Sequence, residues 1–106
     1  MIPFTQRVIE LIHEIPRGQV CTYRQLAIMA GSPNASRQVA WILHSSSAKY
    51  DLPWHRVLNS KGNIVLSTEE GQLEQRTLLL REGVPFLSDF QVDLDQCLWH
   101  PHSIKK

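Results

Sequence analysis

Gly31 marks a tight turn between two short stretches with helical patterning, and this junction limits the possible folds more than any other feature of the chain. Before the turn, Thr22 followed three residues later by Gln25 has the form of a capping box, which predicts the start of a helix. After the turn, Ser32 as the N-cap and Pro33 at the first helical position predict that a second helix begins at once. The pattern is that of two helices joined by a glycine-containing turn.

The second of these helices has an apolar face and a polar face. Its predicted buried stripe consists of Ala35, Val39, Ile42 and Leu43. The side chains expected to face outward are Asn34, Arg37, Gln38 and Trp41. A helix-turn-helix over about residues 22–44, with its second helix in a DNA groove, fits this pattern. Helical hairpins also occur as plain packing units, so the pattern alone leaves both interpretations open.

Length and composition place further bounds on the chain. With 106 residues, 12.2 kDa and 42% apolar residues, we expect one small domain over residues 1–106. No apolar run is long enough to cross a membrane, and the N-terminus lacks a secretory signal. We therefore expect a cytoplasmic protein, associated with the nucleoid when bound to DNA if the source is bacterial. The two cysteines are too few for a secreted disulfide framework.

Charge is distributed unevenly along the sequence although the net charge is only +1. Residues 17–61 contain six basic side chains and one acid, whereas residues 69–95 contain seven acids and two arginines. A cationic middle segment favours contact between one face of the protein and a polyanion.

The first predicted element is an amphipathic helix from Phe4 to Ile15, which Pro16 and Gly18 end. Residues 45–51 are polar and predict a loop. Two short apolar runs at 57–58 and 64–66, separated by a turn sequence, predict a small β hairpin where a wing would lie.

Thr68 is the expected N-cap of a last main helix over about residues 69–82, and Gly83 its terminator. The inner face of this helix is predicted to be formed by Leu73, Thr77 and Leu80. The tail, residues 85–106, contains a possible edge strand in which Phe90, Val92 and Leu94 alternate with polar residues. The expected fold class is mostly α with a small β hairpin.

The segment 53–57, Pro-Trp-His-Arg-Val, resembles a catalytic segment without a reactive atom at its centre. A histidine polarised by a carboxylate can activate a thiol, and His55 and Glu82 are the candidate pair. The position beside the histidine holds Trp54, whose indole is neither acid, base nor nucleophile at neutral pH. Another thiol, Cys21 or Cys97, is the remaining candidate nucleophile.

Cys97 lies near His100 and His102, but three candidate ligands within six residues, with no fourth, do not form a standard zinc pattern. We expect neither a metal nor a cofactor.

Several motifs in order make the chain similar to the DNA-binding domain of the O6-alkylguanine-DNA alkyltransferases. They are Ile15-Pro16-Arg17-Gly18-Gln19-Val20, Thr22-Tyr23, Ala30-Gly31-Ser32-Pro33, Ser36-Arg37-Gln38-Val39, Pro53-Trp54-His55-Arg56-Val57 and Leu79-Leu80-Arg81-Glu82-Gly83-Val84. The chain resembles most closely the alkyltransferase-like proteins, in which the cysteine of the Pro-Cys-His-Arg segment is replaced, commonly by tryptophan. The resemblance extends to about Val84. Ala40-Trp41 departs from it, because the enzymes usually have two glycines there.

The resemblance implies a winged helix-turn-helix and a damage sensor that binds O6-alkylguanine in duplex DNA without alkyl transfer. Tyr23 would press on the lesion phosphate, and Arg37 would fill the space of the extruded base. The pocket for that base would be lined by Trp54, Val57, Leu66 and Ser67. Other implied DNA contacts are Thr22, Gln25, Asn34, Ser36 and Gln38, whereas His55 and Glu82 would be retained from the enzyme active site.

The implied partners are the damage-recognition proteins of nucleotide excision repair, and we expect a monomer without membrane contact. Two alternatives stay open at this point. One is a divergent, active alkyltransferase that uses another cysteine. The other is a helix-turn-helix transcription regulator that reads undamaged DNA.

Overall fold

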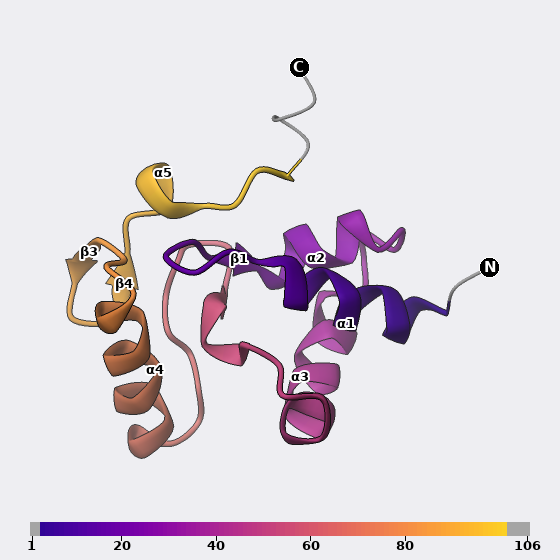
Figure 1. Cartoon of the computed structure of the whole chain (residues 1–106), viewed down its shortest axis with the longest axis horizontal. Helices are drawn as coiled ribbons and strands as arrows, with labels where there is room; N and C mark the ends of the chain where they lie inside the picture. Colours follow the sequence, from indigo (N-terminus) through magenta and orange to yellow (C-terminus); the bar gives the residue numbers. More distant parts are fainter. Residues whose placement is uncertain (1–2, 102–106) are drawn as a thin grey trace.

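Helices dominate the structure, a computed structural model that describes residues 3–101 (Figure 1). The α helices are α1 (Phe4–Glu14), α2 (Tyr23–Met29), α3 (Ser36–Tyr50), α4 (Glu69–Arg81) and α5 (Leu94–Cys97), and a 3-10 turn, η1, covers Trp54–Arg56. The strands are β1 (Cys21–Thr22), β2 (Val57–Leu58), β3 (Phe86–Ser88) and β4 (Gln91–Val92). Helices α1, α2 and α3 lie on one side of the view in Figure 1, and α4 with β3 and β4 on the other.

The helix starts predicted from capping residues at Thr22 and Thr68 are confirmed. The Thr22 hydroxyl accepts the N–H of Gln25 at 3.0 Å, and the Thr68 hydroxyl accepts the N–H of Gly71 at 3.0 Å. Gly83 follows the end of α4 with a φ of 82°, the left-handed conformation expected of a helix terminator.

The predicted start of the second helix at Ser32 is wrong, because α3 begins at Ser36. The N–H of Ser32 donates to the carbonyl of Ala27 at 2.9 Å, so this residue closes α2 instead of opening α3. A separate turn follows, in which the N–H of Ala35 donates to the carbonyl of Ser32 at 3.0 Å. Helices α2 and α3 still pack together as a helix-turn-helix pair.

The predicted loop over residues 45–51 is also wrong, because α3 continues to Tyr50. The Ser45 and Ser47 hydroxyls donate to the carbonyls of Ile42 and Leu43 one turn earlier, so the helix accommodates these polar side chains. Asp51, with a φ of 53°, ends it.

The β hairpin predicted from residues 57–58 and 64–66 does not form. Strand β2 pairs in parallel with β1, with Cys21 opposite Val57 and Thr22 opposite Leu58, whereas residues 64–66 are not a strand. The small antiparallel pair is formed instead by β3 and β4. The expected tail strand is therefore confirmed at β4, although Leu94 begins α5.

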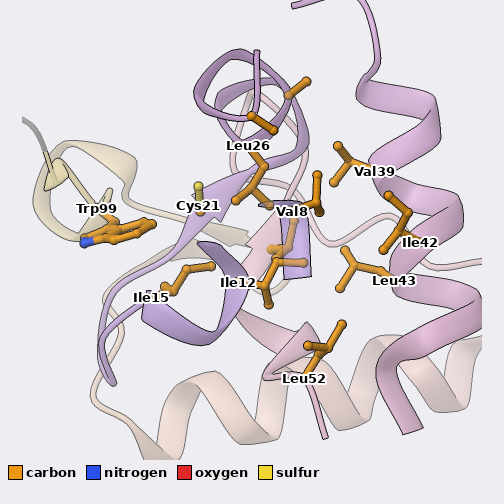
Figure 2. Close-up of a cluster of buried hydrophobic side chains, with 13 residues drawn as sticks. Val8, Ile12, Ile15, Cys21, Leu26, Val39, Ile42, Leu43, Leu52 and Trp99 are labelled. Carbon is orange, nitrogen blue, oxygen red and sulfur yellow. The ribbon is translucent and has the colours of Figure 1, made fainter. Parts of the chain in front are cut away.

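Two apolar clusters hold these elements together, and the β1–β2 pair lies between them. The first joins α1, α2 and α3 and includes Val8, Ile12, Leu26, Val39, Ile42 and Leu43 (Figure 2). The second is formed by Val20, Leu58, Ile64, Leu79, Val84, Val92 and Cys97. Cys21 and Val57 belong to the first cluster, and their chain neighbours Val20 and Leu58 to the second. Successive side chains along an extended segment point to opposite sides, so each of the two segments contributes to both clusters and joins them.

The tail takes part in this framework. The N–H of Val20 donates to the carbonyl of Cys97 at 2.9 Å, and the N–H of Trp99 donates to the carbonyl of Val20 at 2.8 Å. The indole of Trp99 packs near Cys21 and Ile15 in the first cluster (Figure 2). Within residues 3–101, none of the helices has the length and hydropathy needed to span a bilayer.

The predicted inner face of α4 is wrong. Leu73 and Leu80 are 50% and 45% exposed, and Thr77 is exposed as well. The buried residues of the helix are Gln75 and Leu79. The Gln75 amide donates to the carbonyls of His55 and Val57 at 3.0 and 3.1 Å, so its polar side chain faces inward.

Replacing Gln75 by alanine should lower the free energy of unfolding by about 2 kcal/mol, because two carbonyls would lose their shared donor in a site that is only 2% exposed. Urea denaturation followed by circular dichroism measures the change. Replacing the adjacent exposed Glu74 by alanine is the matched control and should change stability by less than about 0.5 kcal/mol. Equal effects of the two substitutions would contradict this role of Gln75.

Candidate nucleic-acid interface

The carboxylate of Glu82 connects three segments of the chain. Its oxygens lie 2.7 Å from Nε2 of His55, 3.0 Å from Nε of Arg56 and 2.8 Å from Nη2 of Arg56. The backbone N–H of Gly18 also donates to it at 3.0 Å. The structure thus brings together His55 and Glu82, the pair expected from the sequence.

These contacts determine the charge state of Glu82. Burial raises the pKa of its carboxyl, but the hydrogen bonds from Arg56, the Gly18 N–H and His55 outweigh burial and lower the pKa from 4.5 to about 2. The remaining guanidinium nitrogen of Arg56, Nη1, donates to the carbonyl of Ile15 at 2.8 Å. The segment 53–57 is therefore fixed to the end of α4 and to the segment that follows α1.

A pocket of about 250 Å³ opens beside Trp54, and the structure brings Trp54, Val57 and Leu66 together around it as expected. Ser67, expected with them, is exposed and does not line the pocket. Tyr23 is also part of the wall, although the sequence predicted a phosphate contact for it. Burial raises the pKa of the Tyr23 phenol, so the hydroxyl remains a hydrogen-bond donor at neutral pH.

The sequence reasoning missed five further residues of the pocket wall. They are Ala40, Leu43, His44, Ser47 and Gln75. Four of these project from one face of α3, at the helical spacing 40, 43, 44 and 47, and only Ser47 lies beyond the predicted end of the helix at about residue 44. Gln75 comes from α4 and carried no comparable signal.

The predicted recognition face lies on the N-terminal half of α3 and on the turn before it. Asn34, Arg37 and Gln38 are exposed and border an open hollow of about 720 Å³, whereas Ser36 is half-buried at the start of the helix. The hollow is also lined by Ser32, Pro33, Ala35 and Trp41.

Thr22 and Gln25 have structural contacts in addition to their predicted role at DNA. Thr22 is buried as the N-cap of α2. The Gln25 amide nitrogen donates to the Trp99 carbonyl at 2.6 Å, and its oxygen accepts from the Cys21 thiol at 3.3 Å. Contact with DNA by these two residues stays a prediction.

Comparison with known proteins assigns the chain to a family. A family model described as the DNA-binding domain of 6-O-methylguanine DNA methyltransferase matches residues 3–84. The chain belongs to this family. Its resemblance to the alkyltransferase DNA-binding domain, predicted from the sequence motifs, is confirmed.

Two relatives in this family are similar to the chain over most of its length. It is 43% identical over 97 residues to the DNA base-flipping protein of Escherichia coli, covering 92% of this chain and 74% of the relative. It is 33% identical over 106 residues to alkyltransferase-like protein 1 of Schizosaccharomyces pombe, covering 95% and 98% of the two chains.

The fold agrees with a solved structure of the same branch of the family. The crystal structure of S. pombe Atl1 in complex with damaged DNA containing O6-carboxymethylguanine matches with a TM-score of 0.83 and 31% identity, covering 95% of this chain and 100% of that one. The predicted helix-turn-helix fold is therefore confirmed.

Both cysteines of the chain, Cys21 and Cys97, are buried. Burial raises the pKa of Cys21 to about 12, against a smaller opposing effect of a hydrogen bond from the Thr22 backbone. Burial and the negative charge of Asp93 raise the pKa of Cys97 to about 11. The nucleophilic form of cysteine is the thiolate, so neither thiol is suited to attack an alkyl group at neutral pH.

The tail does not assemble a metal site in the part of the chain that the structure describes. No group of three histidine, cysteine or acidic residues with suitable positions occurs there. His102, one of the residues considered from the sequence, lies outside the described residues.

Replacing Glu82 by glutamine should lower the free energy of unfolding at pH 7 by about 2 kcal/mol, because an uncharged amide with a single acceptor oxygen replaces the carboxylate that accepts from Arg56, His55 and the Gly18 N–H. The folded-state pKa of Glu82 lies below 4.5, so its stabilising contribution is present above about pH 4.5 and is lost as the pH falls toward 2. The stability difference between wild type and variant should shrink over this range.

Denaturant unfolding at a series of pH values measures this dependence, with Glu74→Gln on the exposed face of α4 as the control. A difference between wild type and Glu82→Gln that stays constant from pH 7 to pH 2 would contradict it.

Proposed function

We propose that the protein binds O6-alkylguanine in duplex DNA, takes the flipped base into the pocket beside Trp54, and does not transfer the alkyl group. The observation that carries this proposal is the pocket itself, which lies at the centre of the Pro-Trp-His-Arg segment where the resembled enzymes have their reactive cysteine. A site built for alkyl transfer would need a nucleophile there, whereas a site for binding needs only a complementary surface.

The dimensions and lining of the pocket support this role. Its volume of about 250 Å³ lies below the usual range for small-molecule sites, roughly 300–1,000 Å³, and suits a single base. The rings of Trp54 and Tyr23 offer aromatic surface for stacking. Val57 and Leu66 add apolar surface for an alkyl substituent, which water would solvate poorly.

The side chains around the pocket can hold an alkylated base but cannot accept its alkyl group. The indole of Trp54 has no nucleophilic atom, and its ring stands edge-on to His55 at 6.2 Å between centroids. His55 and Arg56 hold the Glu82 carboxylate, so the former catalytic apparatus has a structural task. The buried thiols of Cys21 and Cys97 speak against an alkyltransferase that uses another cysteine.

The names of the relatives agree with this class of ligand. The E. coli relative is named a DNA base-flipping protein, and S. pombe Atl1 was crystallised with DNA that contains an O6-substituted guanine. In our proposal Arg37 occupies the space of the extruded base, and Tyr23 contacts the phosphate of the lesion nucleotide from the rim of the pocket. The side-chain amides of Asn34 and Gln38 contribute DNA contacts from the exposed surface.

We further propose that the protein acts as a monomer and that the bound complex is passed to the damage-recognition proteins of nucleotide excision repair. A protein that holds a lesion without removing it needs a second system to complete the repair. A transcription regulator would have no use for a base-sized pocket, so we do not favour that alternative.

Titration of the protein with two otherwise identical duplexes tests the proposed function. We expect binding to a duplex containing O6-methylguanine to be tighter by a factor of about ten or more than binding to the unmodified duplex. Mass spectrometry of the recovered protein should show no added methyl group. Equal affinity for the two duplexes, or a methyl group on Cys21 or Cys97, would contradict the proposal.

Replacing Arg37 by alanine should weaken binding to the lesion duplex by about tenfold or more, because the gap in the base stack would lose the side chain that fills it. Fluorescence anisotropy at constant salt measures the affinity. Arg81→Ala, which removes another exposed arginine, at the end of α4, is the matched control for charge. If both variants lose the same affinity, Arg37 contributes only general electrostatic attraction.

A further inference from the structure

Trp41 is the most exposed large apolar side chain in the described part of the chain, with 64% of its surface accessible. It lies on α3 four residues after Arg37, so the two side chains share one face of the helix, one turn apart. Both border the open hollow of about 720 Å³, which is distinct from the pocket beside Trp54. An indole in this position exposes apolar surface to water unless a ligand covers it.

The chemistry of this hollow matches a nucleobase. The indole of Trp41 provides a flat aromatic surface, and the bases of single-stranded DNA stack on such surfaces. The side-chain amides of Asn34 and Gln38 can donate to and accept from the polar edge of a base. Arg37 adds a planar cation, and no acidic residue lines the hollow.

The hollow also borders the lesion pocket. The ring of Trp41 lies 5.8 Å from the ring of His44, centroid to centroid, and His44 is part of the pocket wall. The two sites therefore occupy neighbouring faces of one helix. When a guanine is flipped into the pocket, its former partner is the base left without a pairing contact.

We propose that the hollow between Arg37 and Trp41 is a second base-binding site, which holds the unpaired partner of the flipped guanine stacked on the Trp41 indole. This inference rests on the proposed function, because base flipping creates the unpaired base. The site stabilises the opened duplex from the opposite strand, in addition to the contacts that the flipped base makes near Trp54.

The experiment compares wild type and Trp41→Ala on two duplexes that contain an abasic site and therefore need no flipping. In the first duplex the abasic site faces cytosine, and in the second it faces another abasic site. Trp41→Ala should weaken binding to the first by about tenfold and to the second by less than about twofold. An equal loss on both duplexes, or no loss on either, would overturn the proposal.

Two further variants and one further duplex complete the design. Trp41→Phe keeps a stacking surface and should retain most of the affinity for the first duplex, whereas Leu87→Ala removes a similarly exposed side chain, 63% accessible, on β3 and should retain all of it. The O6-methylguanine duplex separates the two proposals. If the wild type binds the O6-methylguanine duplex no more tightly than the unmodified duplex, the proposed function is wrong. Binding to the two abasic duplexes would still show whether Trp41 contacts the unpaired base.

Discussion

The carboxylate of Glu82 is the contact on which the arrangement of the site depends. It receives hydrogen bonds from the Gly18 backbone and from the side chains of His55 and Arg56, so three segments that are distant in sequence meet at one negative charge. Such contacts are directional, unlike apolar packing, and they fix the orientation of the segment that carries Trp54. The low pKa of the Glu82 carboxyl has the same origin. The His55–Glu82 pair thus acts as a structural joint between these segments.

The pocket is built beside the first apolar cluster, which contributes Leu43 and Val57 to its wall. Tyr23 and Leu43 approach it from the helix-turn-helix side, and Gln75 approaches it from α4. The parallel β1–β2 pair keeps these two sides together, and the double hydrogen bond from Gln75 attaches α4 to the segment around β2. The shape of the pocket therefore depends on the β1–β2 pairing and on the hydrogen bonds of Gln75 as well as on the aromatic side chains of its wall.

Much of this structure could be predicted from local sequence signals, because caps and terminators act within a few residues. Thr22, Thr68 and Gly83 were correctly placed for that reason. The errors arose where a distant or alternative partner decides the outcome. Ser32 closes the preceding helix, the serines after Leu43 bond to their own helix, and the strand at residues 57–58 finds its partner at β1. The wall residue Ser47 was missed because the helix was predicted to end near residue 44, and Gln75 because the inner face of α4 was predicted wrongly, whereas Trp54, Val57 and Leu66 were found through the family resemblance.

The uninterrupted course of α3 sets a limit on how the protein can adapt to its ligands. Arg37 and Ser47 are ten residues apart on one helix, so their separation along its axis is fixed at roughly 15 Å. The opposite wall includes Leu66, which lies outside the regular helices and strands. We therefore expect adjustment to bulkier substituents in the segment around Leu66. The range of alkyl groups that the pocket accepts would then depend on the flexibility of this one short segment. The position of α3 on the DNA would be the same for every lesion.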